Sequence, residues 1–186
     1  MQKSRQLFIA IFCVMFSTVA QAQNAVKSEL FNRAWTSPYA TTFHSGQPLE
    51  SAFPNGFTMT LDKSMIYRYS YVTYPGNPSD TFTKAIDTFD LTKKFVSYSK
   101  AGRKIESTAS LSSDKKTVNF VRTFYNATDP TKLEFTYYET FKVLEDGSVI
   151  LEKEGTATDP NSNFIFVGEK KYPHDYSGEK KKQMAF

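Results

Sequence analysis

Two-residue alternation of apolar and polar residues is the feature that most constrains the fold of this chain. β-Branched and aromatic residues recur at every second position, and clusters of Asp, Asn, Gly, Pro and Ser interrupt the pattern roughly every ten residues. Successive side chains of a β-strand point to opposite faces. The pattern therefore predicts an all-β protein: an antiparallel up-and-down barrel of about 8–10 strands, with a β-sandwich as the alternative.

The clearest alternation belongs to two long strands and the hairpin that joins them. On the first strand, Phe120, Arg122 and Phe124 share one face. The second strand returns with Phe135 and Tyr137 on the side that meets this face. Both strands are long enough to cross a whole barrel wall.

The turn after these strands predicts its own register. A three-residue loop over residues 145–147, with its glycine in the left-handed conformation, places Phe141 opposite Leu151. The same register places Glu139 opposite Lys153. A two-residue turn gives a poorer match of charges across the strands.

A second hairpin is predicted for residues 57–74, with a turn at residues 62–64. Met65, Tyr67 and Tyr69 alternate on its return strand, which predicts that they share one apolar, aromatic face.

Two further elements are expected near the ends of the domain. Apolar residues at spacings of three and four predict a short helix within residues 25–34, just ahead of Trp35. Residues 163–169 are apolar on both sides, which favours a last strand covered on both faces.

The N-terminus has the pattern of a secretory signal peptide. Lys3 and Arg5 precede a short apolar run, and a small-x-small sequence ends at Ala22. We therefore expect a signal peptide over residues 1–22, a single all-β domain over 23–169 and a polar, Lys-rich tail over 170–186. The apolar run is too short to serve as a transmembrane anchor.

Removal of the signal peptide would change the charge and cysteine content. The remaining 164 residues hold 21 basic and 19 acidic side chains and no cysteine. Small secreted animal domains usually carry disulfides, so the sequence favours a bacterial periplasmic or secreted protein. A nearly balanced charge with no basic stripe along the strands argues against a nucleic-acid partner.

Catalytic and metal-binding patterns are sparse. His44 and His174 are the two histidines, and each lies in a segment typical of a solvated surface. The chain has no Gly-x-Ser-x-Gly elbow, His-Glu-x-x-His motif or phosphate-binding glycine loop. Acidic pairs such as Glu152 and Glu154 are typical of the outer face of a strand. We expect a protein that is not an enzyme and that needs no metal or cofactor.

The candidate ligand-binding residues are an arginine and the aromatic residues expected around it: Tyr67, Tyr69, Phe120, Arg122 and Tyr137. An arginine on an apolar face is costly without a partner. One interpretation is a hook for a carboxylate or phosphate inside a barrel cavity, because the planar guanidinium suits such groups. The other is an arginine stacked on aromatic rings or paired with a structural acid.

The short helix that leads into a tryptophan, followed by antiparallel strands, resembles the lipocalins. Their opening Gly-x-Trp motif corresponds to Arg33-Ala34-Trp35, which keeps the tryptophan and lacks the glycine. Lipocalins also pack a late arginine on this tryptophan, and here no arginine follows Arg122. The resemblance implies a small, partly apolar ligand inside the barrel. The alternative function is an envelope interaction or structural module that acts through loops such as 75–80 or 126–131.

Overall fold

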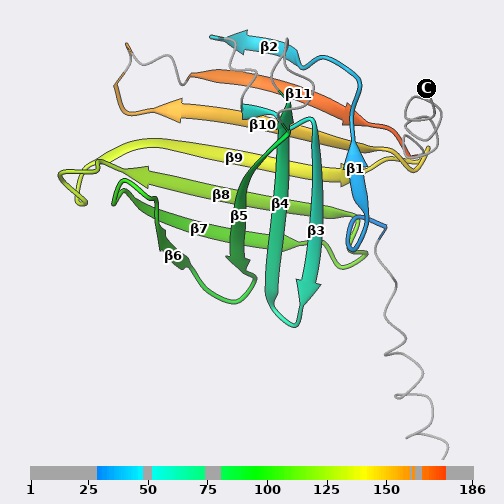
Figure 1. Ribbon diagram of the computed structural model, residues 1–186, viewed down its shortest axis with the longest axis horizontal. Coiled ribbons are helices and arrows are strands. Elements are labelled where there is room, and N and C mark those ends of the chain that lie inside the picture. Colours follow the sequence, from blue (N-terminus) through cyan, green and yellow to red (C-terminus); the bar gives the residue numbers. More distant parts are fainter. Residues whose placement is uncertain (1–28, 48–51, 74–80, 160, 162–164, 175–186) are drawn as a thin grey trace, which may run out of the picture.

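The computed structural model describes residues 29–47, 52–73, 81–159, 161 and 165–174, without the side chains of residues 72, 73 and 81–85. These residues form an all-β protein (Figure 1). The strands are β1 (Ala34–Thr36), β2 (Thr42–Gly46), β3 (Gly56–Asp62), β4 (Met65–Thr73), β5 (Thr81–Asp90), β6 (Phe95–Tyr98), β7 (Lys104–Leu111), β8 (Thr117–Tyr125), β9 (Leu133–Val143), β10 (Val149–Ala157) and β11 (Phe166–Tyr172).

The strands form two antiparallel sheets. One has the order β1-β3-β4-β5, and the other has the order β2-β11-β10-β9-β8-β7-β6. Strands β3, β4 and β5 cross the seven-stranded sheet at a steep angle (Figure 1). The predicted all-β antiparallel class is therefore confirmed. Among the described residues, however, the ladders of the two sheets do not join, so the arrangement has the two facing sheets of the sandwich alternative.

The hairpin between β9 and β10 has the register that the sequence predicts. Phe141 pairs with Leu151 and Glu139 pairs with Lys153. Gly147 has a φ of 74°, which is the left-handed conformation that a three-residue loop requires. The turn residue thus fixes which side chains of β10 point into the protein.

The hairpin between β3 and β4 shows that one predicted face is wrong. Asp62 pairs with Met65, so the turn holds two residues rather than three, and Lys63 adopts a φ of 53°. One residue less in the turn moves every side chain of β4 to the other face. Ile66 and Arg68 are therefore buried.

The predicted N-terminal helix is also wrong where the structure describes it. Residues 29–33 form turns and bends, and Ala34 begins β1, whereas residues 25–28 lie outside the described part. Asn32 has a left-handed φ of 59° and donates its N–H to the Met59 carbonyl at 2.7 Å, which is incompatible with a continuing helix. Leu30 and Trp35 are nevertheless buried, so their spacing reflects core packing.

The last strand is shifted relative to its prediction. It begins at Phe166 and ends at Tyr172, three residues beyond the expected boundary at residue 169. Residues 162–164 lie outside the described part. Only one face of β11 is covered, because Tyr172 is fully buried and Val167 is exposed.

The core lies between the sheets and is mainly aromatic. Phe57 contacts Phe141 and Tyr172 edge-on, with ring centroids 4.7 and 4.9 Å away. The Tyr172 hydroxyl donates to the Pro54 carbonyl at 2.6 Å. The guanidinium of Arg33 lies 4.7 Å from the Trp35 ring centroid. The arginine that packs on this tryptophan therefore comes from two residues before it and not from late in the chain.

Within the described ranges, no helix is long and apolar enough to cross a membrane.

Candidate ligand-binding site

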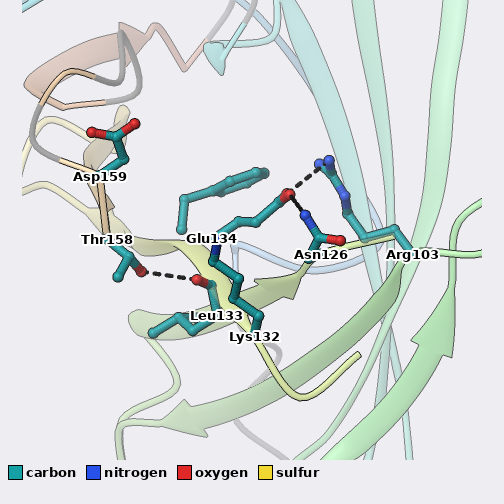
Figure 2. Close-up of a pocket in the computed structure, with 8 residues that line it drawn as sticks. Arg103, Asn126, Lys132, Leu133, Glu134, Thr158 and Asp159 are labelled. Carbon is teal, nitrogen blue, oxygen red and sulfur yellow. Dashed lines mark hydrogen bonds and ion pairs between the residues drawn. The ribbon is translucent and has the colours of Figure 1, made fainter. Parts of the chain in front are cut away.

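A pocket of about 700 Å³ lies at the start of β9, among the segments that precede β7, connect β8 to β9 and follow β10 (Figure 2). Its lining residues are Arg103, Asn126, Lys132, Leu133, Glu134, Phe135, Thr158 and Asp159. The volume lies within the range of about 300–1,000 Å³ that is typical of small-molecule sites.

Polar side chains hold the rim of this pocket in place. Glu134 forms an ion pair with Arg103 at 2.7 Å and accepts a hydrogen bond from Asn126 at 2.8 Å, as Figure 2 shows. Thr158 donates to the Leu133 carbonyl at 3.0 Å. The Arg103 guanidinium also lies 5.4 Å from the centroid of the Phe135 ring. Phe135 is thus the large apolar ring of the lining, with a charged group stacked on it.

The aromatic surface continues from Phe135 toward the core. Phe135 stacks on Phe124, its cross-strand partner, with centroids 4.5 Å apart. Tyr137 lies 5.2 Å from Phe135 and 5.4 Å from Phe124. On β10, the residues opposite Tyr137 and Phe135 are Gly155 and Ala157, whose small side chains add little bulk to this face.

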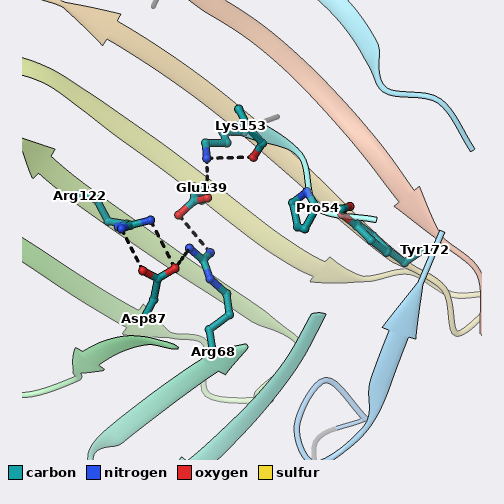
Figure 3. A network of polar contacts seen from close by, with 8 residues as sticks. Pro54, Arg68, Asp87, Arg122, Glu139, Lys153 and Tyr172 are labelled. Atoms are coloured by element: carbon teal, nitrogen blue, oxygen red, sulfur yellow. Dashed lines mark hydrogen bonds and ion pairs between the residues drawn. The ribbon is translucent and has the colours of Figure 1, made fainter. Parts of the chain in front are cut away.

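Behind these rings lies a network of five charged side chains from both sheets (Figure 3). Arg68 of β4 donates to Glu139 of β9 at 3.0 Å and to Asp87 of β5 at 2.8 Å. Arg122 of β8 contacts the two Asp87 carboxylate oxygens at 2.9 and 3.4 Å. Lys153 of β10 lies 2.9 Å from Glu139 and donates to the Ala52 carbonyl at 3.1 Å. The network therefore connects the two sheets.

Arg68 is the centre of this network. Its side chain is 4% exposed and lies 5.2–5.5 Å from the ring centroids of Phe89, Phe120 and Phe141. Its Nε atom is buried and has no hydrogen-bond partner among the described residues. Leaving a buried N–H without a partner is costly.

The mutual pairing opposes the effect of burial on the pKa of each deep member of the network. Burial would raise the pKa of Glu139, but Arg68 and Lys153 outweigh it and hold that pKa well below its usual range. Burial also lowers the pKa of Lys153, and Glu139 opposes this shift. For Arg68, both carboxylates offset the effect of burial and raise the pKa above its ordinary value.

Three of the five predicted site residues lie together on the inner face. Arg122 is paired with Asp87 and stacked over Phe124 at 5.1 Å, so a structural acid and an aromatic ring both contact it. Phe120 is fully buried in the core. Tyr137, opposite Arg122, is half-buried, and desolvation raises its pKa to about 12.

The other two predicted residues lie elsewhere. Tyr67 and Tyr69 alternate with the buried Ile66 and Arg68, so they are on the outer face of the four-stranded sheet. The expectation that they line the interior is wrong, because the turn before β4 is one residue shorter than predicted.

Four network residues were not recognised from the sequence: Arg68, Asp87, Glu139 and Lys153. For Glu139 a signal was present, because it occupies the inward position between Tyr137 and Phe141. Asp87 is 13% exposed and binds two arginines. A charged residue at an inward position between aromatic residues, as at Glu139, is the sequence signal for a buried ion pair.

A second, smaller hollow of about 300 Å³ lies on the outer face of the seven-stranded sheet. Its lining includes Tyr138 of β9, Glu152 and Glu154 of β10 and Val167 of β11. His44 contacts Glu169 there at 3.2 Å. In the part of the chain that the structure describes, no group of three or more His, Cys, Asp or Glu side chains is placed to hold a metal ion.

Comparisons with known proteins add two structural alignments. No protein-family model matches the chain, and no curated protein sequence matches it significantly. A structure described as the REP1-NXSQ fatty acid transporter aligns with a TM-score of 0.37 and 11% identity, over 64% of this chain and 68% of that one. A fatty-acid-binding protein from Manduca sexta aligns with a TM-score of 0.36 and 11% identity, over 63% and 71%. At these TM-scores the likeness carries no argument about this chain.

Proposed function

We propose that this protein is an exported, non-enzymatic binding protein for a small, partly apolar molecule. The observation that carries the proposal is the continuity between the pocket and the inner aromatic face. Phe135 lines the pocket and also stacks on Phe124. A ligand that enters beside Arg103 can therefore lay its apolar part along rings that already belong to the interior.

The site differs from the one expected from the sequence. It retains Arg122 and Tyr137 and adds Phe124 and Phe135 at the mouth. Tyr67 and Tyr69 are not part of it, since they lie on the other face of the four-stranded sheet. Phe120 supports the network from within the core rather than lining the pocket.

A fluorescence titration with the neutral apolar probe N-phenylnaphthylamine tests the binding site. Phe135→Ala removes the ring at the mouth, and we expect on the order of tenfold weaker probe binding, which corresponds to lost contact with about two buried carbon groups at about 0.8 kcal/mol each. Tyr69→Ala, on the outer face, is the matched control and should leave probe affinity unchanged. Equal affinities in all three proteins would contradict the proposed site.

Export is tested separately by the mass of the mature protein. The proposal expects a chain that begins at Gln23 and is recovered outside the cytoplasm when the full-length sequence is expressed with its N-terminus intact. Replacement of residues in the apolar run by charged ones should retain the precursor in the cytoplasm. A full-length chain in the cytoplasmic fraction of the unaltered protein would contradict export.

The second candidate function is an interaction module. Tyr138 is 47% exposed and Val167 is 36% exposed, and both border the smaller hollow. Exposed apolar residues around a hollow mark possible contact surfaces. If Tyr138→Ser abolishes capture of a protein partner and Phe135→Ala does not, this candidate is favoured.

A further inference from the structure

The charge of the buried network bears on what kind of ligand the proposed site accepts. Three of its members are cations, Arg68, Arg122 and Lys153, and two are carboxylates, Asp87 and Glu139. The formal net charge of the network is therefore +1. An excess charge is costly in a poorly hydrated interior unless another group compensates it.

The sharing of the carboxylates leaves Arg122 and Lys153 each with one carboxylate that Arg68 also contacts. Glu139 serves both Arg68 and Lys153, and Arg68 also takes one oxygen of Asp87. Arg122 has Asp87 as its carboxylate partner among the described residues and shares it with Arg68. Lys153 likewise shares Glu139 with Arg68, and of these two cations Arg122 is the more exposed, at 16% against 5%.

Among the cations of the network, Arg122 is the one that contacts the Phe124–Phe135 pair, beside a pocket whose own lining includes Arg103 and Lys132. It lies two residues before Phe124 on β8, which is about 7 Å of strand from the Phe124–Phe135 pair. Arg122 and Asp87 are 16% and 13% exposed, whereas Arg68, Glu139 and Lys153 are at most 5% exposed. A ligand that passes the aromatic rings therefore meets Arg122 and Asp87 before the rest of the network.

We propose that the ligand is an amphiphile with a single negative charge, that this charge binds Arg122, and that Asp87 competes for the same guanidinium and so limits the affinity. The inference rests on the proposed function, because it requires binding at the aromatic mouth. A carboxylate or sulfonate can pair with two guanidinium N–H groups, as Asp87 does here. The apolar part of the ligand would lie on Phe124 and Phe135.

Two fluorescent probes that differ by one charge provide the test. Anilinonaphthalene sulfonate carries a sulfonate, and N-phenylnaphthylamine is the same ring system without it. Arg122→Met should weaken binding of the anionic probe on the order of tenfold, because a charge-assisted contact is lost, and should change binding of the neutral probe less than about twofold. Asp87→Asn should strengthen binding of the anionic probe and leave the neutral probe unchanged.

The control is Asp146→Asn, which removes one acidic group that pairs with Lys171 on the protein surface. It should alter neither probe. If Arg122→Met does not fold, the opposite effect of Asp87→Asn still decides the matter. Neutral-probe binding with no effect of Arg122→Met or Asp87→Asn on the anionic probe overturns the inference and leaves the proposed function intact. No binding of either probe to the unaltered protein overturns both.

Discussion

The two ends of the inner face of the seven-stranded sheet are both aromatic and buried, but they differ in how closely they are enclosed. At the end near Tyr172, Phe57 and Phe141 are fully buried against one another. At the other end, Phe124 and Phe135 form a stacked pair that borders the pocket. The charged network lies between them. The comparison shows that one end of the sheet is closed by core packing, whereas at the other end a core ring, Phe135, also lines a pocket.

Glu139→Gln should have the largest effect, because it weakens the charged network that lies between the two ends of the inner face. The change leaves Arg68 and Lys153 buried with one carboxylate fewer, and removal of one partner of a buried ion pair costs about 3–5 kcal/mol. Urea unfolding of the two proteins measures the loss. A loss below about 1 kcal/mol would show that the network is hydrated and not a closed boundary between the two ends.

The two inner tyrosines provide a smaller contrast. Tyr172→Phe leaves the buried Pro54 carbonyl without its donor and should cost about 1–3 kcal/mol in unfolding free energy. Tyr137→Phe should cost less than about 1 kcal/mol, because Tyr137 is only half-buried and faces the pocket end. Equal losses would remove the distinction between the two ends.

The same tyrosines should separate in an alkaline titration followed by absorbance. Burial raises the pKa of Tyr137 from 10.0 to about 12 and raises the pKa of Tyr172 well above 10.0. A raised pKa means that the folded state holds the proton more tightly, so the stabilisation is complete below pH 10.0 and is lost as the pH rises through the folded-state value. Tyr137→Phe should remove a titration step near pH 12. Disappearance of that step in Tyr172→Phe instead would reverse the assignment.

The smallest effect is expected on the outer face of the four-stranded sheet. Tyr69→Phe removes a hydroxyl from a half-buried ring and should change the unfolding free energy by no more than about 0.5 kcal/mol. The affinity for either probe should not change. A loss of probe binding would move the site from the inner to the outer face.

The sequence predicted the elements whose register is set by a recognisable turn. Gly147 identifies the loop before β10, and the pairings of Phe141 and Glu139 follow from it. The alternation on β8 and β9 also predicted that the face with Arg122 meets the face with Phe135 and Tyr137, and the structure pairs Arg122 with Tyr137. In these places the turn residues and the alternation along the strand were sufficient to predict which side chains face one another.

Other features depended on information that is not local. At Lys63 a non-glycine residue adopts the left-handed conformation, so the two-residue turn that reverses the face of β4 has no strong sequence signal. This register makes Arg68 an inner residue, and the two acids that pair with it, Asp87 and Glu139, come from other strands. Its ion pairs could not be derived from the strand that carries it.

A crystal structure of the protein with N-phenylnaphthylamine tests the central claim most directly. The account predicts the naphthyl ring in contact with Phe124 and Phe135, with access through the pocket beside Arg103. A probe bound instead against Tyr67 and Tyr69, on the outer face of the four-stranded sheet, would contradict it.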